Sequence, residues 1–250
     1  MAAGKGTRMG GDLPKVMHEV AGVPMLRHVV GACTSAGCSR VIVIVGYKQE
    51  LVRGALTDFG QRVMCAVQDQ QLGTGHAVMC TRDAFTGVAD WQSRDVFVLA
   101  GDGPLIRPET LSALLREHRS AGNSATLATA VIDDPTGYGR IVRDASGRFA
   151  AIVEHRDCTP AQLAVREVNP SYYCFRAADL FEMLPQVRRN ASSGEYYITD
   201  VPGLLLSRGK GIGVIDSVPA EDILSINTPA ELGRVDRIMR ARSGVSGAAS

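Results

Sequence analysis

The sequence predicts an α/β protein with a doubly wound, mostly parallel sheet. Short β-branched runs alternate with amphipathic segments along the chain, which is the pattern of repeated strand–helix units. The clearest run, Val41 to Val45, ends at a glycine, as buried parallel strands do before a ligand-binding turn. Hydrophobic residues make up 45% of the 250 positions, enough to build an extended core.

The elements follow in a regular order in the first half of the chain. Strands are expected at 40–45, 62–68 and 95–100, and helices at 49–58, 74–85 and 110–121, with Thr74 as a candidate N-cap. From about residue 124 strands predominate, at 124–132, 139–143, 149–154 and 165–175. Helices are expected again at 177–187 and 200–207, followed by a strand at 211–218 and a last helix at 228–240.

The N-terminal stretch A-A-G-K-G-T-R-M-G-G-D-L-P-K predicts a binding site for a polyphosphate. Gly4 and Gly6 carry no side chain that would keep a phosphate from the backbone N–H groups. Lys5, Arg8 and Lys15 add three cations. A flexible basic tail is the alternative for a glycine-rich start alone, but three cations at this spacing favour the phosphate site. The Walker and dinucleotide glycine patterns do not fit the stretch.

No apolar strand precedes this loop in the sequence, although α/β folds place phosphate loops at the carboxyl end of a strand. We therefore expect a gap at the centre of the sheet and a loop without a supporting strand. An incorrectly assigned start codon and a truncated, defective protein are the two explanations. The first is favoured, because every downstream motif is intact.

Asp102 is a candidate metal ligand. It follows the apolar run V-F-V-L-A and a glycine, so its carboxylate lies where α/β sheets bind ligands. An ordinary turn aspartate is the alternative. With the glycine-rich loop nearby, we favour a Mg²⁺ ligand, because Mg²⁺ takes one or two carboxylates together with phosphate oxygens.

The loop resembles the signature of sugar-nucleotide pyrophosphorylases, and the closest likeness is to their uridylyltransferase domains for N-acetylglucosamine 1-phosphate. Seven further motifs follow in family order, namely Q-L-G-T-G-H-A (71–77), G-D-G-P-L-I (101–106), D-P-T-G-Y-G-R-I (134–141), I-V-E-H-R-D (152–157), E-V-N (167–169), G-E-Y-Y-I-T-D (194–200) and I-N-T (226–228). The resemblance implies a Rossmann-like fold of the nucleotide-diphospho-sugar transferase type. It also implies transfer of UMP from UTP to the sugar phosphate with release of pyrophosphate, by Mg²⁺-assisted in-line attack.

The same resemblance implies roles for individual residues. Arg8 and Lys15 would be catalytic, and Asn227 would join Asp102 as a metal ligand, although Asn227 is also a plausible N-cap of the next helix. The implied nucleotide-binding residues are Ala2, Ala3, Gly4, Lys5, Gly6, Lys15, Gln68, Gly73 and Thr74, with Gln71 as a further candidate for the base. The implied sugar-binding residues are Gly139, Glu154, Asn169, Tyr197 and Thr199, with Glu195 as a less certain member.

We interpret residues 1–241 as one nucleotidyltransferase domain, with a nucleotide-binding half (1–123) and a sugar-binding half (124–241), followed by a disordered tail at 242–250. No hexapeptide repeat follows, so a C-terminal β-helix acetyltransferase domain is not expected. Two alternatives remain open: another sugar-1-phosphate nucleotidylyltransferase, or a catalytically silent regulatory module of the same fold.

Composition bears on partners and location. The net charge of +1 gives no field that would recruit nucleic acid or an anionic membrane. The longest apolar run is too short to span a bilayer, and no secretory signal is visible. The six cysteines form no C-x-x-C pair, so we expect reduced thiols in the cytoplasm. UTP and a sugar 1-phosphate are the expected partners.

Overall fold

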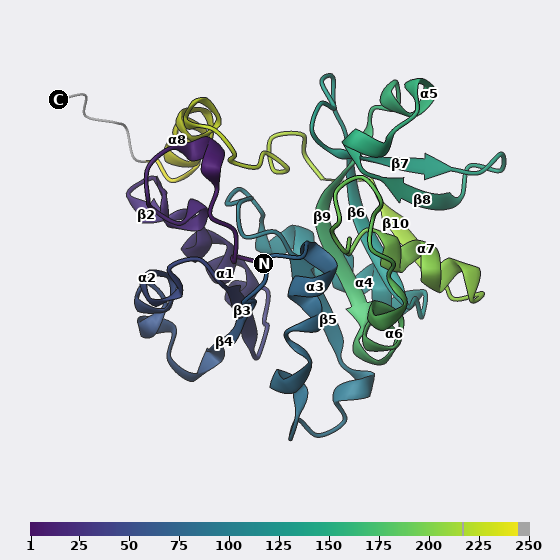
Figure 1. Ribbon diagram of the computed structural model, residues 1–250, viewed down its shortest axis with the longest axis horizontal. Coiled ribbons are helices and arrows are strands. Elements are labelled where there is room, and N and C mark those ends of the chain that lie inside the picture. Colours follow the sequence, from purple (N-terminus) through teal and green to yellow (C-terminus); the bar gives the residue numbers. More distant parts are fainter. Residues whose placement is uncertain (217, 245–250) are drawn as a thin grey trace.

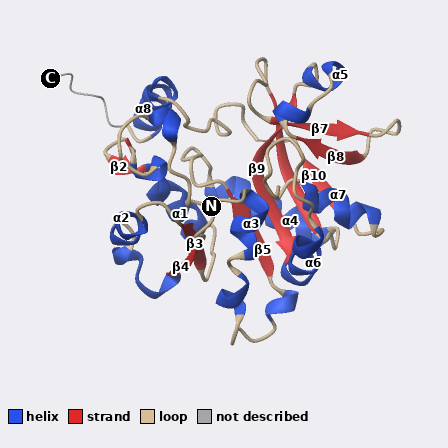
Figure 2. Cartoon of the chain, in the orientation of Figure 1, coloured by secondary structure: helices blue, strands red, loops and turns tan. Residues whose placement is uncertain are grey.

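The computed structural model describes residues 1–216 and 218–244. The strands are β1 Glu19–Val20, β2 Val23–Pro24, β3 Val41–Val45, β4 Val63–Val67, β5 Asp95–Leu99, β6 Ala125–Val131, β7 Gly139–Arg143, β8 Phe149–Val153, β9 Glu167–Arg176 and β10 Ile212–Ile215. The α-helices are α1 Met25–Ser35, α2 Gln49–Gly54, α3 Thr74–Met79, α4 Pro108–Ser120, α5 Pro160–Leu163, α6 Ala177–Met183, α7 Asp200–Ser207 and α8 Pro229–Arg242. Figure 2 shows helices around a set of central strands.

The predicted α/β class is confirmed, and the larger sheet is mixed. It has six strands in the order β10-β6-β9-β7-β8, with β5 also paired to β9. β10 runs parallel to β6, whereas β9 runs antiparallel to β5, β6 and β7. The buried residues of β9 lie on both faces of the strand, as expected for its central place in the sheet.

A second, two-stranded sheet contains β3 and β4 in parallel. It is separated from β5, and the N-terminus of the chain lies between the two groups of strands (Figure 1). Met1 N and Met1 O bond to Leu99 O and Gly101 N at 2.9 Å each, while Ala2 N donates to Ile44 O at 2.8 Å. The expected gap in the sheet is therefore present. The expectation of an unsupported loop is wrong, because these bonds hold its first residues to the ends of β3 and β5.

Core packing covers both faces of β5. Val98 belongs to one core cluster together with residues of α3, α6 and α7. Leu99 belongs to another cluster together with residues of α1 and α4. Because successive strand residues point to opposite faces, the two clusters lie on opposite sides of the sheet. This layering holds the carboxyl ends of the strands rigidly at one edge.

Several element ends differ from the predictions. The helix expected at 74–85 stops at Met79 and gives way to a 3-10 turn, Arg82–Phe85. Gly73, with φ 98°, precedes that helix in place of Thr74 as N-cap. The helix expected at 49–58 ends at Gly54. Apolar spacing alone does not locate these breaks, because it indicates the buried face of a helix and not the residue at which the helix ends.

The C-terminal region also departs from expectation. The Thr228 side chain, and not that of Asn227, caps α8 by accepting from Glu231 N at 3.3 Å. The helix continues through Arg242, one residue into the expected tail, and residues 245–250 lie outside the described part of the chain. The strand expected at 211–218 ends at Ile215, and residue 217 is not described. In residues 1–216 and 218–244, no helix has the length and apolarity needed to cross a membrane.

Candidate active site

The carboxyl ends of β3, β4 and β5 meet at one edge of the molecule. Gly46 follows β3, Gln68 follows β4, and Asp102 comes three residues after β5. The glycine-rich loop crosses this edge, because Ala3 O accepts from Tyr47 N at 3.1 Å and Gln71 Nε2 at 2.8 Å. In parallel α/β sheets, ligands bind in the crevice at these strand ends.

A lysine joins the two predicted metal ligands. Lys15 Nζ forms a short ion pair with the carboxylate of Asp102 and donates to Asn227 Oδ1 at 2.7 Å. Arg8 reaches the same Asn227 oxygen at 3.0 Å. The side chains of Lys15 and Asp102 are only 15% and 22% exposed, so their charges are poorly screened by water. Four residues that are far apart in the sequence therefore converge at one point.

These residues fit a divalent cation with hard oxygen ligands. The oxygens of Asp102 and Asn227 already face one positive group, the Lys15 ammonium. Mg²⁺ is commonly held by one or two protein oxygens together with phosphate oxygens and water. Within the described ranges, no cluster of three or more His, Cys, Asp or Glu side chains could hold a metal by itself. Phosphate oxygens would therefore have to complete the coordination.

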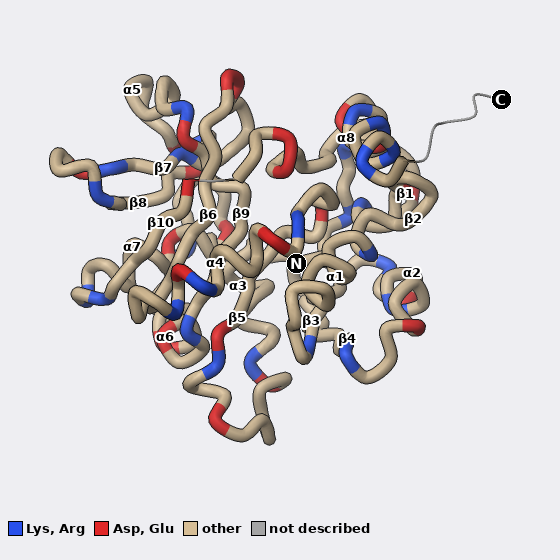
Figure 3. The backbone as a smooth tube through the Cα atoms, turned by 180° about the vertical axis from the view of Figure 1, so that it is seen from behind, with Lys and Arg blue, Asp and Glu red and all other residues tan. Residues whose placement is uncertain are grey.

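The loop itself is shaped by glycine. Gly6 has φ 71°, and a Cβ there would lie 2.5 Å from Lys15 Cβ, so only glycine lets the loop pack on this lysine. Gly4, Lys5 and Arg8 are exposed, and Lys5 Nζ lies 5.2 Å from the centre of the Tyr47 ring. Backbone and cationic side chains are thus both available to an anionic ligand. Figure 3 shows acidic and basic positions interspersed elsewhere along the chain.

The two glutamines expected to contact the base differ in exposure and in their partners. The Gln68 side chain is buried, 4% exposed, and its Nε2 lies 3.0 Å from both Gly73 O and His76 Nδ1. Gln71 is exposed and is held by Ala3 O. Gln68 therefore shapes the 69–73 turn, whereas Gln71 borders the loop directly.

The turn after Gln71 links the two halves of the chain. Gly75 N donates to Tyr196 O at 2.7 Å, and Ile198 N donates to Thr74 Oγ1 at 3.0 Å. A Cβ on Gly73 would lie 2.6 Å from Tyr196 O, so this contact requires glycine. Thr74 thus anchors the segment that carries the predicted sugar-binding residues.

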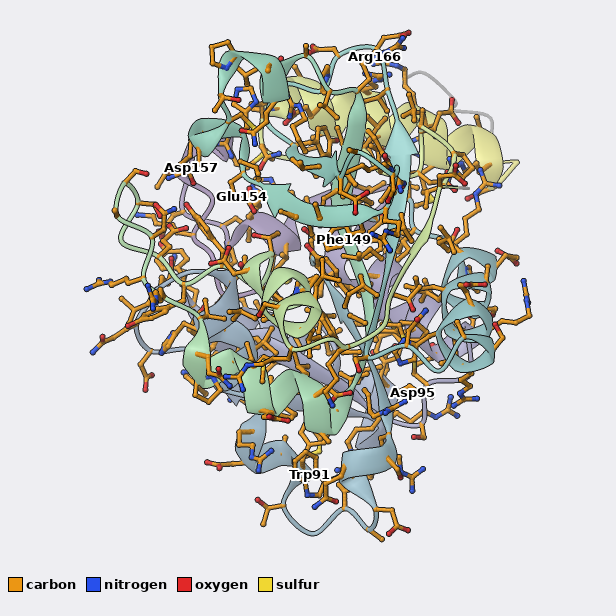
Figure 4. The ribbon with its side chains drawn as sticks, turned by 90° about the vertical axis from the view of Figure 1, so that its right-hand side faces the viewer. Trp91, Asp95, Phe149, Glu154, Asp157 and Arg166 are labelled. Carbon is orange, nitrogen blue, oxygen red and sulfur yellow. The ribbon has the colours of Figure 1, made fainter. Side chains whose placement is uncertain are left out.

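The predicted sugar-binding residues lie on β7, directly after β8, on β9 and in the 194–200 segment. Glu154 directly follows β8 and accepts from Thr199 Oγ1 at 3.0 Å. Burial raises the pKa of the Glu154 carboxyl above its usual value, because the ionised form loses hydration. Gly139 pairs with Asn169 across β7 and β9. Figure 4 shows Glu154 near Asp157 and far from Trp91.

Two of these side chains are already engaged within the protein. Asn169 Nδ2 donates to Tyr173 OH at 2.6 Å, and its Oδ1 accepts from Ser171 N at 3.2 Å. The buried Tyr197 donates its hydroxyl to Ser193 Oγ at 2.6 Å. Both residues therefore have partners that fix their side-chain orientation.

Sequence reasoning missed one residue that positions the site. Glu231 Oε2 accepts from Asn227 N at 2.7 Å and from the Thr228 hydroxyl at 3.1 Å. The sequence T-P-A-E carries the signal for this arrangement, because Thr and Glu three residues apart form a capping box at a helix start. The cap of α8 thus fixes the backbone on which Asn227 is carried.

The fold and the site together define a nucleotidyltransferase. A glycine-rich loop, two cations and an acid–amide pair face one another at the carboxyl edge of an α/β sheet. Residues 1–193 match the family described as the MobA-like NTP transferase domain. The chain belongs to this family.

Curated relatives extend the match across nearly the whole chain. The chain is 43% identical over 242 residues to the bifunctional protein GlmU of Clostridium acetobutylicum, covering 97% of this chain and 52% of that protein. It is 44% identical over 243 residues to the bifunctional protein GlmU of Heliobacterium modesticaldum, covering 97% and 51%. The corresponding protein of Clostridium perfringens is 42% identical over 242 residues, with 97% and 52% covered. The chain thus spans about half the length of these relatives.

Proposed function

We propose that this chain transfers UMP from UTP to N-acetylglucosamine 1-phosphate, giving UDP-N-acetylglucosamine and pyrophosphate, in the cytoplasm. One observation carries the proposal: Lys15, Asp102 and Asn227 converge beside the glycine-rich loop. That arrangement suits a nucleoside triphosphate with a divalent metal. The choice of uridine and of an N-acetylated sugar rests on the resemblance and on the relatives named GlmU.

The residues of the chain have distinct parts in this reaction. Lys15 and Arg8 offset negative charge on the phosphates as the sugar phosphate oxygen attacks the α-phosphorus. Asp102 and Asn227 would hold Mg²⁺, which would supply positive charge to the phosphates. No covalent intermediate is required, because positioning and charge neutralisation supply most of the catalysis in phosphoryl-type transfers.

Contacts tie two of the predicted sugar-binding residues, Glu154 and Thr199, to the turn beside the glycine-rich loop. Gly103, next to Asp102, lies against β9, since a Cβ there would be 3.2 Å from Tyr172 OH. β9 also carries Asn169. Glu154 is tied through Thr199 to the segment that contacts Gly73. This continuity supports a sugar site next to the phosphate site.

The experiment is a pyrophosphate-release assay with Mg²⁺, each of the four nucleoside triphosphates and a panel of sugar 1-phosphates. We expect turnover to be fastest with UTP and N-acetylglucosamine 1-phosphate. Preference for another nucleotide or sugar would favour another sugar-1-phosphate nucleotidylyltransferase. Absence of turnover with every pair would favour the silent regulatory module.

Asp102→Asn is the decisive variant in the same assay. We expect it to lose at least about a hundredfold in kcat, because one oxygen ligand of the metal loses its charge. Asp133→Asn is the matched control, since the Asp133 side chain is 98% exposed and pairs only with Arg166 among the described residues. Near-normal turnover by Asp102→Asn would remove this carboxylate from the proposed metal site.

A further inference from the structure

The segment that carries Asn227 has no regular structure of its own. Within the described residues, no helix or strand lies between the end of β10 at Ile215 and the start of α8 at Pro229. The backbone hydrogen bonds that the segment makes within itself lie at 219–224, before Asn227. An irregular segment of this kind is positioned by the contacts that the surrounding scaffold makes with it.

Two tyrosine hydroxyls from the second half of the chain hold this segment. Tyr172 OH of β9 donates to Asp222 O at 2.7 Å, and Tyr138 OH donates to Ile223 O at 3.2 Å. A tyrosine suits this task, because its ring packs as an apolar body while the hydroxyl at its tip makes a hydrogen bond. The two contacts fix adjacent main-chain carbonyls.

Tyr138 is itself held next to a predicted sugar-binding residue. Its N donates to Pro135 O at 3.2 Å, and its O accepts from the guanidinium of Arg140, which is buried. The next residue, Gly139, begins β7 and pairs with Asn169 of β9. Tyr138 therefore joins the turn before β7 to the segment that carries Asn227.

The Tyr138 hydroxyl is a neutral hydrogen-bond donor at pH 7. Burial raises the pKa of this hydroxyl, and hydrogen bonding with Ser225 opposes the shift. Because the ordinary pKa of tyrosine is already about 10, the proton stays on the oxygen. Phenylalanine at position 138 would keep the ring and its packing and would lose only the hydroxyl.

A short path leads from this hydrogen bond to the proposed metal ligand. Asn227 follows Ile223 by four positions. Asn227 Nδ2 donates to Ser225 Oγ at 3.2 Å, which orients the amide, and Ile226 N donates to Asp102 O at 3.0 Å, which holds the two proposed ligands together. Both contacts depend on where residues 223–226 lie.

We propose that Tyr138 is a positioning residue that acts through Asn227, because its hydroxyl ties the segment carrying this ligand to the turn before β7. The proposal rests on the proposed function, in which Asp102 and Asn227 hold a divalent metal. Small displacements of a ligand matter, since Mg²⁺ demands near-ideal octahedral geometry. Residues that orient metal ligands accordingly affect metal affinity without contacting the metal.

The test is calorimetry of UTP binding, once with saturating Mg²⁺ and once with EDTA in its place. The ratio of the two dissociation constants measures how much the metal tightens binding. Tyr138→Phe should lower this ratio at least about threefold, the effect of one lost hydrogen bond, and should leave the constant in EDTA unchanged. Tyr196→Phe is the matched control, because it removes a hydroxyl from the segment that contacts Gly73, and the ratio should not change.

A double-mutant cycle with Asn227→Ala separates positioning from general damage to the fold. Tyr138→Phe should lower the ratio in the parent chain and have no further effect in the Asn227→Ala chain, because the group that it positions is then gone. Equal losses in the two backgrounds would show that Tyr138 does not act through Asn227 and would overturn the proposal.

Hydrogen exchange tests the same link without nucleotide or metal. The amide of Ile226 reports on the contact between the two proposed ligands, because it bonds to Asp102 O. It should exchange at least about threefold faster in Tyr138→Phe than in the parent chain, and at the parent rate in Tyr196→Phe. An unchanged rate in Tyr138→Phe would contradict the proposal.

The outcomes distinguish failure of this inference from failure of the proposed function. If Asn227→Ala leaves the ratio unchanged, the proposed metal site is wrong and the role of Tyr138 fails with it. If Asn227→Ala lowers the ratio and Tyr138→Phe does not, only the role of Tyr138 fails. A higher KM for N-acetylglucosamine 1-phosphate with an unchanged ratio would make Tyr138 part of the sugar site and would also overturn the proposal.

Discussion

At the scale of single residues, Lys15 links the two oxygen groups on which the proposed metal site depends. Its ammonium contacts both Asp102 and Asn227, which are 125 positions apart in the chain. A point charge with three donors suits this place, because it can face two oxygens and still turn toward a phosphate. Arg8 contacts only Asn227 of the pair and is exposed on the loop.

Replacing Lys15 by alanine should therefore lower kcat more than it raises KM for UTP. Loss of one preorganised charge in the transition state costs about 3 kcal/mol, or roughly a hundredfold in rate. Lys48→Ala is the control, because Lys48 is near the loop but pairs with the exposed Asp12. Steady-state kinetics with varied UTP measure both constants, and a change confined to KM would make Lys15 a plain binding residue.

Glu154 allows a prediction about pH. Burial raises the pKa of its carboxyl, so the folded protein holds this proton more tightly than the unfolded chain does. Its contribution to stability is therefore greatest at low pH and is lost as pH rises through the raised pKa. Glu154→Gln, which keeps an acceptor for Thr199, should melt higher than the parent chain at pH 7.

The same variant should lose efficiency with the sugar phosphate, because a neutral amide is a weaker acceptor for sugar hydroxyls than a carboxylate. Thermal melts between about pH 4 and pH 8 measure the stability effect, and the gain should shrink toward the acidic end. A gain of equal size at every pH would show that ionisation of Glu154 is not its cause.

The sequence was sufficient to find the polar residues that meet beside the glycine-rich loop. Lys15, Asp102 and Asn227 stand in motifs with few alternatives, and the structure brings them together. The sequence does not give the partners of Gln68. Whether a glutamine faces a ligand or the interior depends on its partners, and Gly73 O and His76 become its neighbours only after folding.

At the scale of elements, the turn before α3 joins the two halves of the chain through backbone contacts. Gly73 packs against Tyr196 O and Gly75 N bonds to it. The sequence predicted a helix here but not its short length. The spacing of hydrophobic residues indicates which face of a helix is buried. It does not indicate where the helix ends, and tertiary packing sets the end of α3 at Met79.

Gly73→Ala should destabilise the protein more than Gly87→Ala. Both glycines have positive φ, 98° and 78°, so both variants carry a backbone penalty of about 1–3 kcal/mol. Only the Cβ at position 73 meets backbone, whereas that at position 87 has nothing within 4 Å. Overpacking adds about 1–3 kcal/mol at Gly73. Urea melts of the two variants measure the difference, and equal midpoints would mean that the Gly73–Tyr196 contact yields without cost.

At the scale of the whole molecule, a buried carboxylate ties the C-terminal helix to the rest of the fold. Asp222 is 0% exposed and forms ion pairs with Arg107, at the start of α4, and Arg242, at the end of α8. Tyr172 OH of β9 donates to Asp222 O at 2.7 Å. No local pattern in the sequence indicates this cluster, because its members lie in four separate parts of the chain.

Asp222 also lies close in the sequence to the candidate active site. The segment that follows it carries Asn227, and Ile226 N donates to Asp102 O at 3.0 Å. A shift of the 219–227 segment would therefore displace one proposed metal ligand relative to the other. Removing one charge from a buried ion pair costs about 3–5 kcal/mol, because the remaining charges lose their partner in a poorly hydrated place.

Asp222→Asn should lower the melting temperature by on the order of 10 °C, and kcat should fall at temperatures where the variant is still folded. Asp133→Asn again serves as the control, because its exposed pair with Arg166 is worth at most about 1 kcal/mol. Calorimetry and the pyrophosphate assay together separate the two effects. If both variants melt alike, the arginines at 107 and 242 are satisfied by water and α8 is held by its apolar contacts alone. If only stability falls, the position of Asn227 is set by the cap of α8 and does not depend on Asp222.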